Sequence, residues 1–119
     1  MVVRNNPAPD CGDIILVSFD PTSGSEQRGK RPALVLSPRD YNRLTGLCVA
    51  VPITSHGKGY PFEVALVDRV QGSTHGFALA DQVRCLSWQA RQAKVIDCAN
   101  PDVLEEVRGR LAALLQLAS

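Results

Sequence analysis

From residue 13 to residue 97, hydrophobic and polar positions form short runs of the kind that predict β-strands. Residues 13–19 and 32–37 are rich in β-branched and other apolar side chains, and each predicts a strand. Residues 47–54 predict a third strand, whose internal Pro52 favours a bulge or an edge position. Further strands are expected at 62–67, 77–79, 82–86 and 93–97.

After residue 99 the pattern changes to the 3–4 spacing of an amphipathic helix. Asn100 is expected to cap its N-terminus, and Pro101 suits the first helical position. The apolar face of this helix is expected to comprise Leu104, Val107, Leu111, Leu114, Leu115 and Ala118. A single helical turn is expected at 40–45, ended by Gly46. Many short strands and one C-terminal helix predict a mainly β fold, a small curved barrel-like sheet with the helix packed on it.

Length and composition fit one ordinary globular domain. The 119 residues are expected to form a single domain, 1–119, and 45% of them are hydrophobic. No run of 18 apolar residues predicts a membrane helix, and the N-terminus has no signal-peptide pattern, so we expect a cytoplasmic protein.

The cysteines do not predict a metal site. In the cytosol they are expected to stay reduced. Their spacing fits neither a Cys-x-x-Cys pair nor the Cys–His spacing of a zinc finger. Cys48 and Cys85 lie in predicted strands and are interpreted as small buried hydrophobic residues. We therefore expect neither a metal nor another cofactor.

The connection between the first two predicted strands, residues 19–32, is longer than a hairpin needs. Long polar connections of this kind usually serve function. Arg31 stands where the next strand begins, and Pro32 restricts it to an extended backbone. Its planar guanidinium is suited to holding a phosphate. The net charge is only +1, but five cations gather between residues 26 and 45: Arg28, Lys30, Arg31, Arg39 and Arg43. Such a patch can bind a polyanion.

A series of short motifs gives the chain a family resemblance. In order they are Gly12-Asp13-Ile14, Phe19-Asp20-Pro21, Gly24-Ser25-Glu26-Gln27, Arg31-Pro32-Ala33, Leu36-Ser37-Pro38, Val51-Pro52-Ile53-Thr54, Lys58-Gly59-Tyr60-Pro61-Phe62-Glu63-Val64 and Leu79-Ala80-Asp81-Gln82-Val83. From about residue 12 to residue 92, the chain resembles MazF/Kid/PemK-type toxins of bacterial toxin–antitoxin pairs. The resemblance implies an SH3-like barrel, a homodimer, a MazE-like antitoxin partner, and sequence-specific, metal-independent cleavage of single-stranded RNA.

The residues are suited to this chemistry. RNA is cleaved when its own 2′-OH attacks the adjacent phosphate, so an enzyme need only move protons and stabilise the phosphorane. Arg31 matches the catalytic Arg of the family and would stabilise the phosphorane. Thr54 matches the catalytic Thr, and its hydroxyl can donate to a phosphate oxygen. Glu26 can act as general base, pair with Arg31, or restrain its loop.

Other residues are expected to bind the RNA or to be bystanders. The expected RNA contacts are Ser25, Gln27, Arg28, Lys30, Ser55 and Gln82. Gln82 and Asp81 carry groups that read base edges, although Asp81 can also anchor a turn. Trp88 is expected in the core or in a subunit interface. His56 can transfer protons, but an exposed loop histidine is the favoured interpretation, and His75 is a weaker candidate.

Two other functional classes are possible alternatives to RNA cleavage, and the sequence disfavours both. A CcdB-like gyrase inhibitor on the same fold would use an aromatic-tipped C-terminal helix, whereas this chain ends without an aromatic residue. An SH3-like peptide-binding module would show an aromatic groove, whereas only 5% of this chain is aromatic. The combination of Glu26, Arg31 and Thr54 favours the endoribonuclease.

Overall fold

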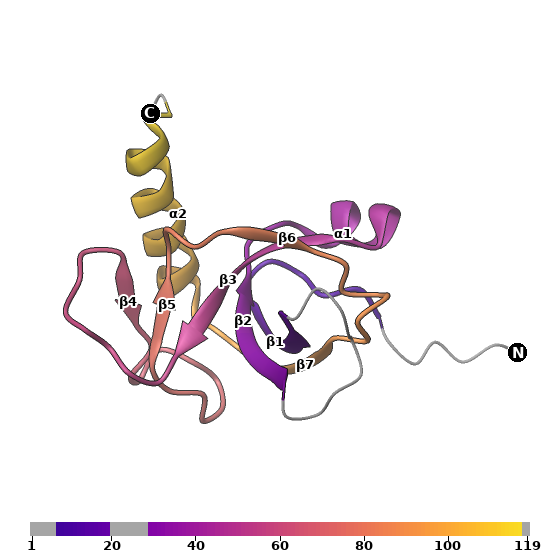
Figure 1. The fold of residues 1–119 in the computed structure, drawn as a ribbon, viewed down its shortest axis with the longest axis horizontal. Coiled ribbons are helices and arrows are strands. Elements are labelled where there is room, and N and C mark those ends of the chain that lie inside the picture. The colour runs from indigo at the N-terminus through magenta and orange to yellow at the C-terminus, as the bar shows by residue number, and fades with distance from the viewer. Residues whose placement is uncertain (1–6, 20–28, 118–119) are drawn as a thin grey trace, which may run out of the picture.

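A computed structural model describes residues 7–19 and 29–117 of the chain, and its elements follow the sequence pattern closely (Figure 1). Their order is β1 (Asp13–Ser18), β2 (Lys30–Val35), α1 (Arg39–Thr45), β3 (Cys48–Thr54), β4 (Glu63–Ala65), β5 (Phe77–Leu79), β6 (Arg84–Leu86), β7 (Lys94–Cys98) and α2 (Pro101–Leu115). The mainly β fold with a C-terminal helix is therefore confirmed. No described helix is long and apolar enough to span a membrane.

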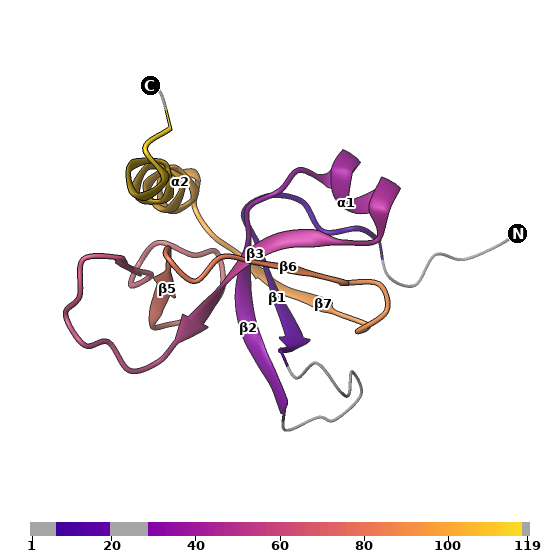
Figure 2. The ribbon, with the colours of Figure 1, turned by 45° about the horizontal axis from the view of Figure 1, so that its top comes forward.

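The strands pair in antiparallel fashion in the order β4-β5-β3-β2-β1-β7, and β6 also pairs with β3. Strand β3 is central, because it has β2 on one side and changes partner on the other. Its first part pairs with β6 up to Ala50–Arg84, and its last part pairs with β5 from Ile53–Ala78. The two partners diverge from β3 in Figures 1 and 2.

Pro52 corrects one prediction from the sequence. It occupies neither an edge strand nor a bulge, since β3 has neighbours on both sides and Pro52 pairs in register with Ala33 of β2. It lies instead between the segments of β3 that pair with β6 and with β5. A proline is tolerated there because the ladder on that side is already interrupted.

Alternate residues of the strands supply two separate hydrophobic cores. One core lies under α2 and includes Ile14, Leu34 and Val51 together with Val103 and Val107 of the helix. The other lies on the opposite strand face and comprises Ala8, Ile15, Val17, Ala33, Val35, Cys48, Ala50, Leu86, Trp88 and Ala93. Period-2 alternation therefore holds in β1 and β2, but both faces are buried.

Helix α2 is attached to the rest of the domain by side chains from Asp102 to Arg110. Arg69 donates to Asp102 Oδ2 at 3.0 Å and to Glu106 Oε1 at 2.8 Å, which joins the helix to the segment after β4. Asn100 precedes the helix as predicted, but its side chain makes no capping bond and accepts instead from Gln71 Nε2. Leu114 and Leu115, predicted on the apolar face, are exposed, because the helix extends beyond the sheet (Figure 1).

Asn42 fixes α1 to the rest of the domain. Its side chain is fully buried, donates to the carbonyls of Pro9 and Ser37, and accepts from the Ser37 hydroxyl at 2.6 Å. Its backbone carbonyl accepts from Trp88 Nε1 at 2.8 Å, so the single Trp is a core residue.

The prediction that both strand cysteines are buried is half correct. Cys48 is buried, and burial together with the neighbouring Cys85 raises the pKa of its thiol to about 12. Cys85 is exposed, because β6 has only three residues and its neighbour Leu86 points into the core in its place.

Candidate active site

Arg31 is held within a strand. Strand β2 begins at Lys30, earlier than the predicted start at residue 32, and Arg31 pairs with Val17 of β1. Val17 and Ala33 belong to the core on this face of the sheet. Arg31 therefore lies on the same face of the sheet as Val17 and Ala33, at the edge of this core. Its side chain is exposed to solvent.

Arg31 and Thr54 lie just beyond the paired part of β2 and β3. The pairs Val35–Ala50, Leu34–Val51 and Ala33–Pro52 define an antiparallel ladder, which ends two residues before Thr54 and two residues after Arg31. Beyond the end of this ladder, Arg31 and Thr54 both line a pocket of about 770 Å³. The other lining residues are Pro32, Ile53, Ser55, His56, Gly72, Ser73, Thr74, His75, Ile96 and Asp97.

The segment after β3 folds back on its own side chains. The Thr54 hydroxyl oxygen accepts from the backbone N–H of His56 at 3.2 Å. This contact occupies a lone pair, so the hydroxyl proton is left to donate to a ligand. The Ser55 hydroxyl lies 3.0 Å from His56 Nδ1. Thr54 is half-buried, whereas Ser55 and His56 are exposed at the mouth of the pocket.

Asp97 of β7 holds the far wall of this pocket. Its carboxylate accepts from the backbone N–H groups of Gly72 and Thr74, at 2.7 and 3.0 Å. Partial burial alone would raise the pKa of Asp97. Hydrogen bonds from the Thr74 hydroxyl and from the backbone amides outweigh it, and the pKa is lowered. A carboxylate engaged in this way is a structural anion and a poor base.

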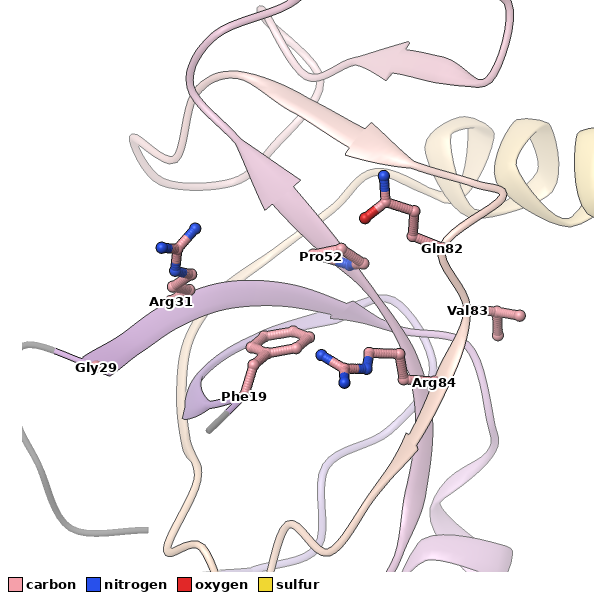
Figure 3. A pocket seen from close by; sticks show the side chains of 7 residues that line it. All are labelled: Phe19, Gly29, Arg31, Pro52, Gln82, Val83 and Arg84. Carbon is pink, nitrogen blue, oxygen red and sulfur yellow. The ribbon is translucent and has the colours of Figure 1, made fainter. Parts of the chain in front are cut away.

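A second pocket, of about 610 Å³, lies where β5 and β6 diverge from β3. It is lined by Phe19, Gly29, Arg31, Pro52, Gln82, Val83 and Arg84 (Figure 3). The Arg84 guanidinium carbon lies 5.2 Å from the centre of the Phe19 ring, a cation–π contact. Arg31 lines both pockets, so it stands between the Thr54 pocket and this one.

The loop between β3 and β4 is braced from two directions. Glu63 accepts from the backbone N–H groups of Lys58 and Gly59, at 2.7 and 3.0 Å. The Tyr60 hydroxyl donates to Asp81 Oδ2 at 2.5 Å, and this hydrogen bond raises the pKa of Tyr60. Asp81 therefore anchors this loop, the second of the two roles expected for it. It lines neither of the two pockets beside Arg31.

The structure thus brings together some of the sequence-predicted residues. Arg31, Thr54 and Ser55 share one pocket, and Arg31 shares the other with Gln82. Lys30 pairs with Ser18 and lines neither. Four expected residues lie outside the described residues: Ser25, Glu26, Gln27 and Arg28. Within residues 7–19 and 29–117, no cluster of three His, Cys, Asp or Glu side chains could hold a metal ion.

Sequence reasoning missed three residues that shape these pockets. Phe19 and Arg84 line the second pocket, and Asp97 holds a wall of the first. Phe19 and Asp97 ended predicted strands, and Arg84 lay inside one, so each was interpreted only as a sheet residue. Their proximity to Arg31 comes from pairing between distant strands, which no local motif reports.

Comparisons with known proteins agree on one family. A family described as PemK-like, MazF-like toxin of type II toxin–antitoxin systems matches residues 10–115. The endoribonuclease toxin MazF of Escherichia coli K12 is 49% identical over 107 residues, covering 90% of this chain and 94% of that protein. Endoribonuclease PemK of Escherichia coli is 40% identical over 117 residues, covering 96% of this chain and 87% of that protein.

Solved structures show the same similarity. MazF from Deinococcus radiodurans superposes with a TM-score of 0.81 at 49% identity, covering 92% of this chain and 98% of that chain. A MazE–MazF structure from the same organism also gives a TM-score of 0.81, at 45% identity, covering 93% of this chain and 98% of that chain.

Proposed function

Because this chain belongs to the PemK-like, MazF-like family of type II toxins, we propose that it is a sequence-specific endoribonuclease that cleaves single-stranded RNA without a metal ion. The family relationship favours RNA cleavage over the CcdB-like inhibition of gyrase that was weighed as the alternative. The single observation that carries the proposal is the placement of Arg31 and Thr54 in one pocket on this scaffold.

The proposed reaction uses the RNA's own 2′-OH as the nucleophile. Attack on the adjacent phosphorus places extra negative charge on the non-bridging oxygens, which Arg31 stabilises through two parallel N–H donors. Thr54 donates its hydroxyl proton to one of these oxygens. The predicted products carry a 2′,3′-cyclic phosphate, or the 3′-phosphate formed from it, and a 5′-OH.

The second pocket is suited to a base next to the scissile phosphate. It offers the Phe19 ring for stacking and the Gln82 amide for hydrogen bonds, and it opens directly beside Arg31. A base held there would position its phosphate at Arg31. Ser55 and Lys30 remain candidates for backbone contacts, together with Ser25, Glu26, Gln27 and Arg28, which lie outside the described residues.

An antitoxin is the expected partner in the cytoplasm, where the RNA substrate lies. MazF of Deinococcus radiodurans is found in complex with MazE. We infer that an acidic MazE-like antitoxin binds this chain at the cationic Arg31 region and competes with RNA. We also propose a homodimer, which would present the cationic patch twice to one long strand.

The decisive experiment is cleavage of a long single-stranded RNA in excess EDTA, with the ends of the products mapped. We expect cuts at one short sequence, with cyclic or 3′-phosphate ends. Products with 3′-OH ends, or activity restored only by Mg²⁺, would show that the proposed mechanism is wrong. A cognate antitoxin that binds tightly but leaves cleavage unchanged would refute the shared site.

A further inference from the structure

The two histidines of this chain line one pocket with Arg31 and Thr54. Strand β3 pairs with β5 through Ile53–Ala78 and Thr54–Phe77, where the ladder ends. His56 follows Thr54 by two residues and His75 precedes Phe77 by two, so both lie just beyond this last pair. Both side chains line the pocket that contains Arg31 and Thr54, and both are exposed to solvent. The chain contains no other histidine.

Close contacts hold the segments beyond this last pair together. A Cβ atom on Gly76 would lie 2.2 Å from the Thr54 carbonyl oxygen and 3.2 Å from Ser55 Cα. A Cβ atom on Gly57 would lie 2.6 Å from the Phe77 ring. The segment 54–57 therefore packs closely against Gly76 and Phe77, and the backbone approach at Gly76 leaves no room for a side chain. His75 is carried beside the Thr54–His56 segment as a result.

Local hydrogen bonds orient His56. Its backbone N–H donates to Thr54 Oγ1, and its Nδ1 lies 3.0 Å from the Ser55 hydroxyl. With Nδ1 engaged by this neighbour, Nε2 is the ring nitrogen that remains for a ligand. Asp97 is the only carboxylate among the described residues that line the pocket, and it is occupied by the backbone amides of Gly72 and Thr74.

We propose that His56 and His75 are the proton-transfer residues of RNA cleavage at the Arg31–Thr54 site. The inference rests on the endoribonuclease function proposed above. It supplies two imidazoles, the side chain that most often serves as general acid or base, whereas neither a guanidinium nor a hydroxyl is suited to that role.

In the proposed cleavage step, the two histidines transfer protons in opposite directions. One imidazole accepts the 2′-OH proton while the 2′-oxygen forms a bond to phosphorus. The bond between phosphorus and the 5′-oxygen breaks, and the other histidine, as imidazolium, gives its proton to that oxygen. The products are a cyclic phosphate and a 5′-OH, and the histidines regain their starting protonation by exchange with water. Within the part of the chain that the structure describes, Arg31 of β2 and Asp97 of β7 are the other charged groups that line this pocket.

The test compares His56→Gln, His75→Gln and the double variant with the wild type in EDTA, under single-turnover conditions across pH. Glutamine keeps a similar size and polar groups, and both positions are exposed, so folding should be unchanged by circular dichroism. Each single variant should cleave about 100-fold more slowly with nearly unchanged RNA affinity. Each should also lose one limb of a bell-shaped pH–rate profile. Lys58→Gln, exposed in the same loop and lining neither pocket, is the matched control and should cleave normally.

A modified substrate separates a proton donor from a structural residue. An RNA with sulfur in place of the 5′-oxygen has a leaving group that needs no protonation. It should restore near wild-type cleavage to one histidine variant and leave the other impaired. A double variant that cleaves within about threefold of wild type, with the same pH profile, would overturn the inference while the nuclease proposal stands. Absence of RNA cleavage by the wild-type chain would refute the nuclease proposal itself.

Discussion

Arg31 and Thr54 line one pocket, and each is held in a strand by a neighbour other than the strand of the other residue. Arg31 of β2 pairs with Val17 of β1, and Thr54 of β3 pairs with Phe77 of β5. Preorganised donors of this kind do not need to rearrange when charge develops in the transition state.

Replacing Arg31 with Ala should slow RNA cleavage about 100-fold to 1000-fold, because one preorganised donor contributes about 3–4 kcal/mol to lowering the barrier. The side chain is exposed, so the variant should unfold at the wild-type temperature. Single-turnover kinetics and thermal melting measure the two effects. Arg31→Lys should recover only part of the rate, since a point charge cannot hold two oxygens in parallel. Wild-type cleavage by Arg31→Ala would refute the assignment.

Thr54→Val should lower the cleavage rate with little loss of stability, because valine keeps the β-branched shape and removes only the hydroxyl. Thr54→Ser restores the hydroxyl and should recover most of the rate. We expect a smaller loss than for Arg31→Ala, about 10-fold to 100-fold, since a neutral donor is weaker than a charged one. Equal cleavage rates for the Val and Ser variants would show that the Thr54 hydroxyl plays no part in the mechanism.

Gln82→Ala should mainly change the sequence preference of RNA cleavage. Its effect on the cleavage rate at the preferred site should be smaller. Losing one hydrogen bond to a base corresponds to about 0.5–1.5 kcal/mol, or roughly 2-fold to 13-fold in preference. Sequencing the cleavage ends of a mixed RNA pool measures the effect. Gln89→Ala, exposed beyond β6 and remote from both pockets beside Arg31, is the control and should leave the pattern unchanged.

Asp97 should make stability depend on pH in the acid range. Its folded pKa lies below the ordinary value of 3.8, so its stabilising contribution is present above that value and is lost as pH falls through the folded pKa. Asp97→Asn should therefore be less stable than wild type at neutral pH, and the difference should narrow below about pH 4. Urea unfolding midpoints across pH test this. A difference that stays constant down to about pH 2 would contradict it.

Asn42→Ala should destabilise the domain by about 2–4 kcal/mol, because it removes three buried hydrogen bonds that join Asn42 to Ser37 and to the Pro9 carbonyl. Arg43→Ala on the same helix breaks only an exposed ion pair with Asp40 and should cost well under about 1 kcal/mol. Urea denaturation compares the two. Similar losses for both variants would show that Asn42 does not fix α1 to the domain.

The sequence predicted the positions of the strands and helices better than it predicted which strands pair. Strands β1 and β3 and helix α2 carry clear sequence patterns, and their positions agree with the structure within a few residues. Arg31 and Thr54 were identified through short family motifs that lie on the strands themselves. Pro52 and Cys85 were misjudged, because the interruption of the β3 ladder and the shortness of β6 depend on how distant segments pair.

The second pocket and the histidine pair escaped prediction for the same reason. The pocket exists because β5 and β6 leave β3 at different points, and both histidines reach one pocket because Thr54 of β3 pairs with Phe77 of β5. Each feature brings together segments 19 or more positions apart, which local patterns do not encode.

The interruption in β3 pairing also has an evolutionary consequence. Gln82 and Val83, which line the second pocket, belong to the link from β5 to β6, whereas Arg31 and Thr54 belong to the paired strands of the sheet. Among the residues that the structure describes, Arg31 alone is common to both pockets. Substitutions in the link can therefore accumulate without disturbing the sheet or its chemistry. A lineage with this fold can acquire new RNA targets while its cutting machinery stays the same.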